Sequence, residues 1–299
     1  MESPSSLLAL GALLTLLLSV ALWLITTPLR TALRRRRLAN PPFPAEWRRL
    51  LQRRMPAWRR LPPDLQRRLR RCIRIFIAEK RFVGCDGLVV SEDMKVLIAA
   101  QACLLVLNRP LDDLAGVREI LLYPGAFAVQ RRETDASGVE HFGPRVHLGE
   151  SSARGQVVLA WDAVLAGAAD PDDGHNVVIH EFAHQLDQQN GEANGAPPMR
   201  GAARIARWAA VMGAAYALLN QQVAAGEPPS LDPYGTHSPA EFFAVASESF
   251  FERPQALERE LPDLYDALRE YYRADPGIWQ ITALASATTT RLRPPSLAR

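Results

Sequence analysis

The chain has 299 residues, enough for one or two globular domains, and a composition that is 48% hydrophobic and 22% charged excludes an intrinsically disordered protein. Its net charge of +3 hides an uneven distribution, because sixteen arginines and two acidic residues lie between Arg30 and Arg74, which leaves the remainder acidic. Three cysteines at irregular spacing (Cys72, Cys85 and Cys103) exclude a disulfide framework and a cysteine-based zinc site, and we expect reduced, buried thiols.

An uncharged, apolar stretch from Leu7 to Thr26 predicts a transmembrane helix. About 20 helical residues cross a hydrocarbon core of about 30 Å. Arginines at positions 30 and 34–37 follow the stretch and no basic residue precedes it, which is unlike a cleavable signal peptide. The positive-inside rule places the arginine side in the cytoplasm. We therefore expect residues 1–38 to be a single-pass anchor in the inner (cytoplasmic) membrane, with the rest of the chain facing the cytoplasm.

The arginine-rich segment after the anchor is open to more than one interpretation. It fits attraction to anionic lipid headgroups, and part of it can equally be the solvated face of a helix. No zinc finger, RNA-recognition signature or aromatic interleaving supports nucleic acid as a partner. Proline, arginine and tryptophan prevail from Asn40 to Pro63, so we expect residues 39–63 to form a juxtamembrane connector.

Beyond the connector, the spacing of apolar residues predicts a domain over residues 64–283, followed by a flexible, Thr- and Arg-rich tail over 284–299. Helices are predicted over Asp64–Arg81 and Met94–Leu107, and strands over Glu119–Val129 and Gln156–Trp161. After Asp173 the pattern is helical, with interruptions at Asn190–Pro198, Gly226–Pro239 and Pro276. The fold class is therefore α+β and predominantly helical, with a small β-sheet ahead of the later helices.

A His-Glu-x-x-His motif, formed by His180, Glu181 and His184, lies within one of these helical patterns. Histidines four residues apart project from one face of a helix, so both imidazoles can reach the same metal ion. Glu181 lies next to that face and can serve as the general base for a zinc-activated water. The motif predicts a catalytic zinc site, and a pair of histidines without metal is the competing interpretation.

A catalytic zinc site takes three protein ligands and keeps one position open. Asn190 occupies the position of the third histidine in metzincins, so the third ligand must come from further along the chain. The candidates are His237, Glu241, Glu248 and Glu252. Glu241 and Glu248 are seven residues apart and share a face of a predicted helix over Pro239–Phe251. Chemistry alone does not choose between them, and His237 ranks lower because a carboxylate more often completes such a pair.

Several longer segments resemble the MtfA (Mlc titration factor A) family of zinc peptidases. They are HEFAHQLD at 180–187, Asn194-Gly195, Tyr234-Gly235 and PAEFFAVASE at 239–248, with PAEW at 44–47, EKRF at 79–82, IAAQA at 98–102, Tyr123-Pro124, LAW at 159–161, PDLY at 262–265 and Asp275-Pro276. The resemblance covers roughly Pro41 to Pro276 and is far more specific than the zinc motif alone.

The resemblance implies a zincin-like catalytic domain whose active-site region is similar to that of anthrax lethal factor, with the sheet packed on the motif helix. It implies Zn²⁺ bound by His180, His184 and Glu241, and a zinc peptidase domain over residues 64–283. It further implies Glu181 as the general base and Tyr234 as the hydroxyl that stabilises the oxyanion.

Three further residues and the anchor lie outside this assignment. His237 either faces solvent or adjusts substrate access, and Asp187 either orients a ligand imidazole or is a polar residue at a helix end. We interpret Glu248 as a supporting residue rather than a ligand. The better-known family members are soluble, so the anchor is a departure from the family.

The leading hypothesis for function is a zinc metallopeptidase that hydrolyses peptide bonds of a peptide or protein substrate, and the resemblance points to aminopeptidase-like cleavage. The alternative is a membrane-tethered regulatory module that binds a protein partner such as a transcriptional repressor, with catalysis secondary, because the family is named for sequestering one. A purely structural zinc requires a fourth protein ligand, and no Cys or His stands at suitable spacing.

Overall fold

The computed structural model describes residues 4–134, 140–147, 149–152 and 155–279 and divides the chain into two units, Met1–Pro42 and Phe43–Arg299. The first unit is the helix α1 (Pro4–Ala39). Among the described residues, α1 is the one helix that is long and apolar enough to cross a membrane. Its leucines from Leu13 to Leu33 are exposed. The predicted apolar N-terminal helix is therefore confirmed.

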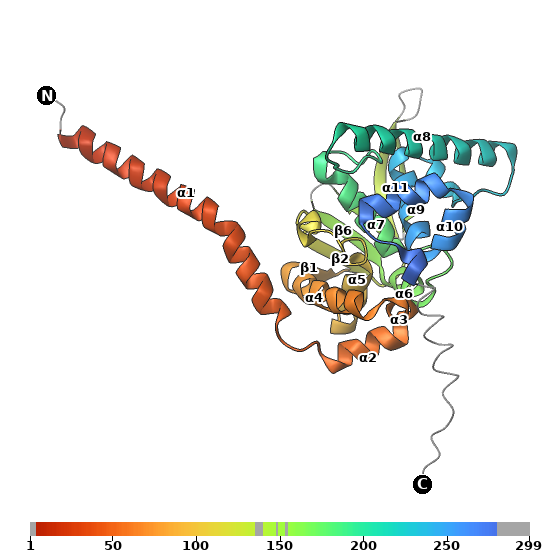
Figure 1. Cartoon of the computed structure of the whole chain (residues 1–299), viewed down its shortest axis with the longest axis horizontal. Helices are drawn as coiled ribbons and strands as arrows, with labels where there is room; N and C mark the ends of the chain where they lie inside the picture. Colours follow the sequence, from red (N-terminus) through yellow and green to blue (C-terminus); the bar gives the residue numbers. More distant parts are fainter. Residues whose placement is uncertain (1–3, 135–139, 148, 153–154, 280–299) are drawn as a thin grey trace, which may run out of the picture. The chain divides into compact units, whose positions relative to one another are not determined.

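The second unit is mainly helical (Figure 1). Its helices are α2 (Ala45–Arg54), α3 (Pro56–Arg60), α4 (Pro63–Glu79), α5 (Glu92–Ala102), α6 (Trp161–Ala169), α7 (Val177–Asp187), α8 (Ala202–Ala225), α9 (Pro239–Glu252), α10 (Pro254–Glu260) and α11 (Pro262–Tyr272), with short 3-10 turns η1 (Leu111–Leu114), η2 (Gln188–Asn190) and η3 (Pro233–Thr236).

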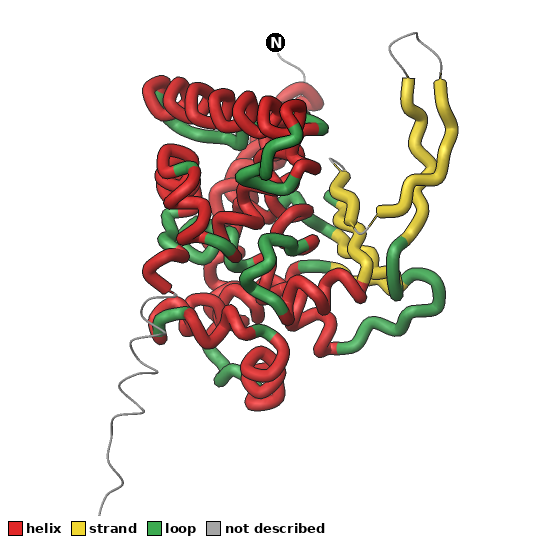
Figure 2. The backbone as a smooth tube through the Cα atoms, turned by 90° about the vertical axis from the view of Figure 1, so that its right-hand side faces the viewer, coloured by secondary structure: helices red, strands yellow, loops and turns green. Residues whose placement is uncertain are grey.

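The strands lie on one side of this helical body (Figure 2). Their bounds are β1 (Arg81–Gly84), β2 (Glu119–Tyr123), β3 (Phe127–Thr134), β4 (Glu140–His147), β5 (Gly149–Ser152) and β6 (Gln156–Ala160). One sheet has the order β1-β2-β6-β5, in which β1, β2 and β6 are parallel and β5 is antiparallel to β6. Strands β3 and β4 form a separate antiparallel pair.

The side chains of β2 and β6 alternate between buried and half-buried positions, the period of two that a strand requires. Ile120 pairs with Val157 and Leu122 with Leu159, and all four are buried. This apolar face joins the core, and β5 and β6 contact α7. The predicted α+β class, with a small sheet against the motif helix, is confirmed.

Helix α7 lies at the centre of the core, where Val178, Phe182 and Leu186 are fully buried. Burial of one such side chain stabilises the fold by about 1.5–3 kcal/mol. The ring of Phe182 packs against Phe76 of α4, with 5.6 Å between the ring centroids. Helix α9 is buried along nearly its whole length and contacts α7. The core therefore fixes α7 and α9 side by side.

The compact unit begins earlier than the sequence indicated. Residues 39–63 were expected to form a connector, but α2, α3 and the residue between them contribute Leu50, Leu51, Met55 and Trp58 to the core. The arginines of these helices occupy the outward positions, and they outnumber and so mask the few apolar residues that face inward.

Two other predicted segments lie further along the chain. The strand predicted over Glu119–Val129 is interrupted after Tyr123 and continues as β3. The tail expected at 284–299 lies outside the described residues.

Candidate metal centre

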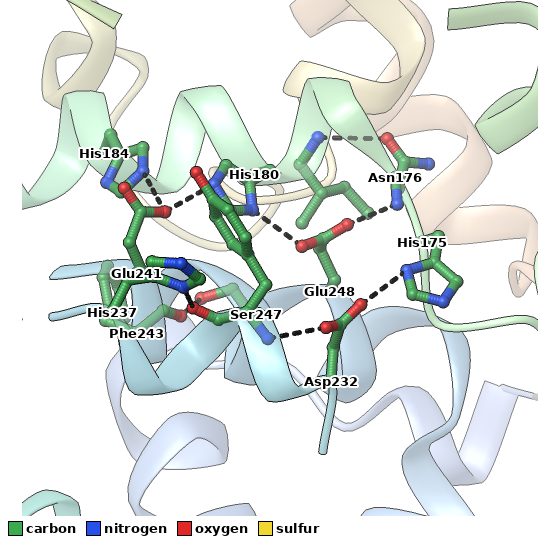
Figure 3. Close-up of polar contacts among 12 residues, drawn as sticks. His175, Asn176, His180, His184, Asp232, His237, Glu241, Phe243, Ser247 and Glu248 are labelled. Carbon is green, nitrogen blue, oxygen red and sulfur yellow. Dashed lines mark hydrogen bonds and ion pairs between the residues drawn. The ribbon is translucent and has the colours of Figure 1, made fainter. Parts of the chain in front are cut away.

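The His-Glu-x-x-His motif lies on α7, as predicted. Asn176 precedes the helix and caps it, because its side-chain oxygen accepts a hydrogen bond from the backbone N–H of Ile179 at 3.0 Å. His180 and His184 are one turn apart, with ring centroids 4.8 Å apart and ring planes at 83°. Both rings project from the same side of α7 (Figure 3).

Glu241 enters the site from α9. The hydroxyl of Ser238 caps this helix by accepting from the backbone N–H of Glu241 at 3.1 Å, which places Glu241 in the first turn. Its Oε2 lies 3.0 Å from Nε2 of His180 and 3.2 Å from Nε2 of His184. The three ligand atoms therefore converge on one point between α7 and α9, all within 4.8 Å of one another (Figure 3).

This arrangement suits a metal ion. Tetrahedral bonds of about 2.0–2.1 Å place neighbouring ligand atoms about 3.3 Å apart, close to the two spacings at Glu241. Burial lowers the pKa of His180, but its hydrogen bonds to Glu241 and Glu248 outweigh burial and raise the pKa well above its usual value. Burial raises the pKa of Glu241, but hydrogen bonds from both imidazoles outweigh it and hold the pKa well below its usual range. The negative charge at this point therefore favours a bound cation.

Glu181 lies on α7 beside these groups and is only 5% exposed. Its Oε2 is buried and has no hydrogen-bond partner among the described residues, so the hydrogen-bonding capacity of this oxygen is unused. Burial raises the pKa of Glu181 to about 7, against the opposing effect of the two histidines. A carboxylate with a pKa near neutrality is suited to take up and release a proton.

Gly149 of β5 makes room for the Glu181 carboxylate. A Cβ at this position would overlap the Oε1 atom of Glu181, so any other residue would displace the carboxylate from its present place. No sequence signal identified Gly149, because it precedes Glu181 by 32 positions and belongs to a strand that was not predicted. The contact arises only from the packing of β5 against α7.

Behind the histidines, a chain of hydrogen bonds holds His180 in place. The Nδ1 of His180 lies 2.8 Å from Oε1 of Glu248, and the other oxygen of Glu248 accepts from the backbone N–H of Asn176 (Figure 3). The side-chain amide of Asn176 donates to Gln101 and to Glu252, each at 2.9 Å. Burial raises the pKa of Glu252 to about 9, so this residue is largely protonated at neutral pH.

These contacts assign positions to Glu248 and Glu252, two of the four residues that the sequence left open as the third ligand. Glu248 contacts the far nitrogen of His180, in agreement with its interpretation as a supporting residue, and Glu252 contacts Asn176 instead of the histidines. The role of Asn176 was not identified from the sequence, although an Asn directly before a helix is a recognised capping signal.

Tyr234 and His237 lie at the edge of the site. Tyr234 belongs to η3, which Asp232 caps by accepting from the backbone N–H of Tyr234 at 2.7 Å, and its ring centroid is 5.9 Å from that of His180. His237 is exposed, and its Nδ1 lies 2.8 Å from the carbonyl oxygen of Tyr234. His237 therefore contacts the turn that carries Tyr234 rather than joining the three converging ligand atoms.

Asp187 lies at the end of α7 and is fully buried. Its Oδ2 accepts from the backbone N–H of Gly195 at 2.7 Å, so Asp187 fixes the loop that follows η2. The predicted alternative, in which Asp187 orients a ligand imidazole, has no corresponding hydrogen bond among the described residues, since both Oδ1 of Asp187 and Nδ1 of His184 lack partners.

Comparison with known proteins adds to this geometry. The model of the family described as glucose-regulated metallo-peptidase M90 matches residues 29–273, which include all of the residues above. The chain belongs to this metallopeptidase family. The resemblance drawn from the sequence segments is thereby confirmed, since relatives of this chain include proteins named Mlc titration factor A.

Its relatives align with two thirds or more of the chain. Mlc titration factor A of Pectobacterium atrosepticum is 38% identical over 208 residues, 67% of this chain and 76% of that protein. Mlc titration factor A of Edwardsiella ictaluri is 37% identical over 227 residues, 74% and 85% of the two chains. An uncharacterized protein of Synechocystis sp. is 36% identical over 266 residues, 89% of this chain and 97% of its own length.

Proposed function

We propose that this M90 chain is a zinc metallopeptidase that hydrolyses peptide bonds. The observation that carries the proposal is the convergence of His180, His184 and Glu241 beside the unpartnered oxygen of Glu181. In this proposal the first three residues hold Zn²⁺. The ion supplies Lewis acidity, which polarises the scissile carbonyl and makes water more acidic.

The residues around the ligands have separate roles. Glu181 takes a proton from the attacking water and delivers it to the leaving amine, which its pKa of about 7 and its buried position support. The hydroxyl of Tyr234 donates a hydrogen bond to the oxyanion that develops on the scissile carbonyl. Glu248 and Asn176 orient His180, and Gly149 leaves the space that Glu181 occupies.

Two finer features belong to the same proposal. The resemblance to the MtfA family supports aminopeptidase-like cleavage of short substrates. The length and apolar character of α1, followed by the arginines at 34–37, support a single-pass anchor in the cytoplasmic membrane with the second unit in the cytoplasm.

Chelation tests metal-dependent hydrolysis directly. The full chain in detergent micelles is treated with a chelator, dialysed, and assayed on unmodified peptides before and after addition of one equivalent of Zn²⁺. We expect hydrolysis to be lost on chelation and restored by the ion. Activity that persists with less than one tenth of an ion per chain would exclude the proposed mechanism.

Glu248→Gln is expected to weaken zinc binding by about tenfold, at the lower end of the range for loss of a supporting partner of a ligand histidine. The amide keeps the shape of the side chain but removes the negative charge that faces Nδ1 of His180. Competition with a fluorescent chelator measures the affinity. Glu252→Gln is the matched control, because Glu252 lies one turn later on α9, is largely protonated and does not contact His180. Equal affinity of Glu248→Gln and the wild type would refute this role.

Tyr234→Phe is expected to lower kcat by about 10²–10³-fold with little change in KM, because the lost hydroxyl acts mainly in the transition state. Steady-state kinetics on a fluorogenic peptide measure both constants. Tyr216→Phe is the matched control, since the Tyr216 hydroxyl donates to the carbonyl of Thr236 and its loss only loosens the turn that carries Tyr234. If the two variants lose the same activity, the Tyr234 hydroxyl supports the structure of the turn and does not stabilise the oxyanion.

A second function, recruitment of a protein partner, is supported by the similarity to proteins named Mlc titration factor A. In this alternative the second unit binds a transcriptional repressor and holds it at the membrane. Pull-down with the doubly substituted chain Glu181→Gln, His184→Ala tests it. Capture of a repressor at wild-type yield would favour the binding function, and loss of capture would tie any partner to the intact metal site.

A further inference from the structure

A cavity of about 580 Å³ opens beside His180 and Glu181, where α7 begins. It lies between α6, the residues that precede α7, and η3. The cavity is therefore next to the point where the proposed hydrolysis takes place, on the side of His180 that faces away from His184. A substrate bound at the metal site would extend into it.

Three aspartates from three segments line this cavity. Asp162 begins α6, Asp173 precedes α7, and Asp232 caps η3. Local backbone N–H groups fix each of them, at 2.7 Å for Asp162, 2.8 Å for Asp173 and 2.7 Å for Asp232. Among the described residues that line the cavity there is no lysine or arginine. His175 also lines the cavity, and its Nδ1 lies 3.3 Å from Oδ2 of Asp232. The wall is therefore acidic, and Asp162 and Asp173 form no ion pair with a described residue of the lining.

Glu181 gives an independent indication that this cavity receives a ligand. It lines the same cavity, is 5% exposed, and carries a buried oxygen that forms no hydrogen bond with a described residue. A buried polar atom without a partner is rare in a folded protein unless water or a ligand completes its bonding. The cavity thus joins the acidic wall to the reacting groups, so a molecule bound along it would contact both.

The rest of the wall is apolar and small. Ala163 and Ala166 of α6, Val177 of α7 and Val245 of α9 contribute to it. Lysine and arginine combine a methylene stem with a charged head, and they bury the stem on apolar surface while the head reaches polar groups. A surface of alanine and valine with carboxylates beside it matches such a side chain.

We propose that this cavity is the substrate subsite for a positively charged group, held by Asp162, Asp173 and Asp232. The group is an ammonium or guanidinium, supplied either by a lysine or arginine side chain next to the scissile bond or by the α-amino group of the peptide. The inference rests on the proposed peptidase function and extends it to the class of substrate. The three aspartates would then give the enzyme a preference for peptides that carry a positive charge.

The test compares alanine-based peptides in which lysine or norleucine stands directly before or directly after the scissile bond. Each peptide is prepared with a free and with an acetylated amino terminus. The zinc-loaded full chain in detergent micelles is expected to hydrolyse lysine peptides with about fivefold higher kcat/KM than norleucine peptides, the gain of one partly exposed ion pair. A preference for lysine that survives acetylation identifies the side chain as the bound cation. Rates that depend only on the free amine identify the α-ammonium. Equal rates for all of these peptides would overturn the proposal.

Asp162→Asn is the variant of choice, because the hydrogen bond of Asp162 joins only the neighbouring residue Ala163, whereas a change at Asp232 would also disturb Tyr234. It is expected to remove most of the preference for the cationic peptide, and Asp162→Glu is expected to retain it. Asp170→Asn is the matched control: it removes the same charge at the other end of α6, outside the cavity lining, and should leave the preference unchanged. Equal preference in Asp162→Asn and the wild type would contradict the assignment.

A binding measurement separates this inference from the peptidase function. The anisotropy of a fluorescent lysine peptide is followed with the full-length Glu181→Gln chain, with and without Asp162→Asn, and a norleucine peptide serves as reference. Selective binding that Asp162→Asn weakens, together with a zinc-loaded wild-type chain that hydrolyses no peptide, would support the subsite and refute the peptidase. Hydrolysis without selectivity in rate or in binding would support the peptidase and refute the subsite.

Discussion

Glu181→Gln is expected to lower kcat/KM for peptide hydrolysis by about 10²–10⁴-fold, the usual contribution of a general base. The amide has nearly the same shape but cannot accept the proton of the attacking water. Glu181 supplies none of the three ligand atoms that converge at the site, so the variant should still bind one zinc ion per chain. Steady-state hydrolysis of a fluorogenic peptide and metal analysis on the same preparation measure both quantities.

Glu192→Gln provides the control for this change, because Glu192 is exposed and follows η2 outside the site. It makes the same replacement of a carboxylate by an amide and is expected to behave as the wild type. Hydrolysis by Glu181→Gln within threefold of the wild-type rate would show that another group accepts the proton. Loss of the metal together with activity would instead make Glu181 a part of the binding site.

Glu241→Ala is expected to have the second large effect, because it removes the carboxylate that both imidazoles face. Loss of a partner behind a ligand already costs about 10–100-fold in metal affinity, so loss of a ligand should cost more. At a free zinc concentration where the wild type holds one ion, we expect the variant to hold less than one tenth and to be inactive. Mass spectrometry with inductively coupled plasma measures the metal.

The control for Glu241→Ala is Glu258→Ala, which removes an exposed carboxylate from α10. Circular dichroism shows whether either variant has lost helical structure. Retention of one tightly bound zinc ion by a folded Glu241→Ala chain would mean that a different residue, such as Glu248, completes the set of ligands.

The helices that apolar periodicity marks clearly were predictable from the sequence. The helix expected over Asp64–Arg81 is α4 (Pro63–Glu79), where Leu65, Leu69 and Phe76 form the buried face. Such a pattern is local, because one turn of helix decides which residues share a face. The helix expected over Met94–Leu107 ends at Ala102 instead, and buried turns follow, since apolar residues in a row do not by themselves distinguish helix from buried turn.

The sheet and the N-terminal edge of the second unit depended on contacts that the sequence does not display. Strand β1 follows α4 directly and is only four residues long, and its partner β2 lies almost forty residues further on. Helix α2 buries Leu50 and Leu51 within a segment that consists largely of arginine. In both cases tertiary packing, and not local propensity, decides the structure.

The residues of the candidate site also fall into those that local spacing predicts and those that depend on tertiary contacts. His180, Glu181 and His184 could be predicted as site residues from one helical turn, because the spacing of the histidines brings both to one face and Glu181 lies next to it. Glu241 required the family resemblance, since it lies 61 positions from His180 and three other residues were chemically acceptable. Gly149 could not be found, and neither could the acidic cavity, because segments distant in the chain meet there only in the folded protein.

The most direct test of the central claim is digestion of a mixed, unmodified peptide library by the zinc-loaded full chain, read by mass spectrometry beside the zinc-loaded Glu181→Gln chain. We predict cleavage by the wild type alone, and the cut positions will show whether residues are removed from amino termini. Absence of cleavage by both proteins, with one zinc ion in each, would contradict the claim that this metal centre hydrolyses peptides.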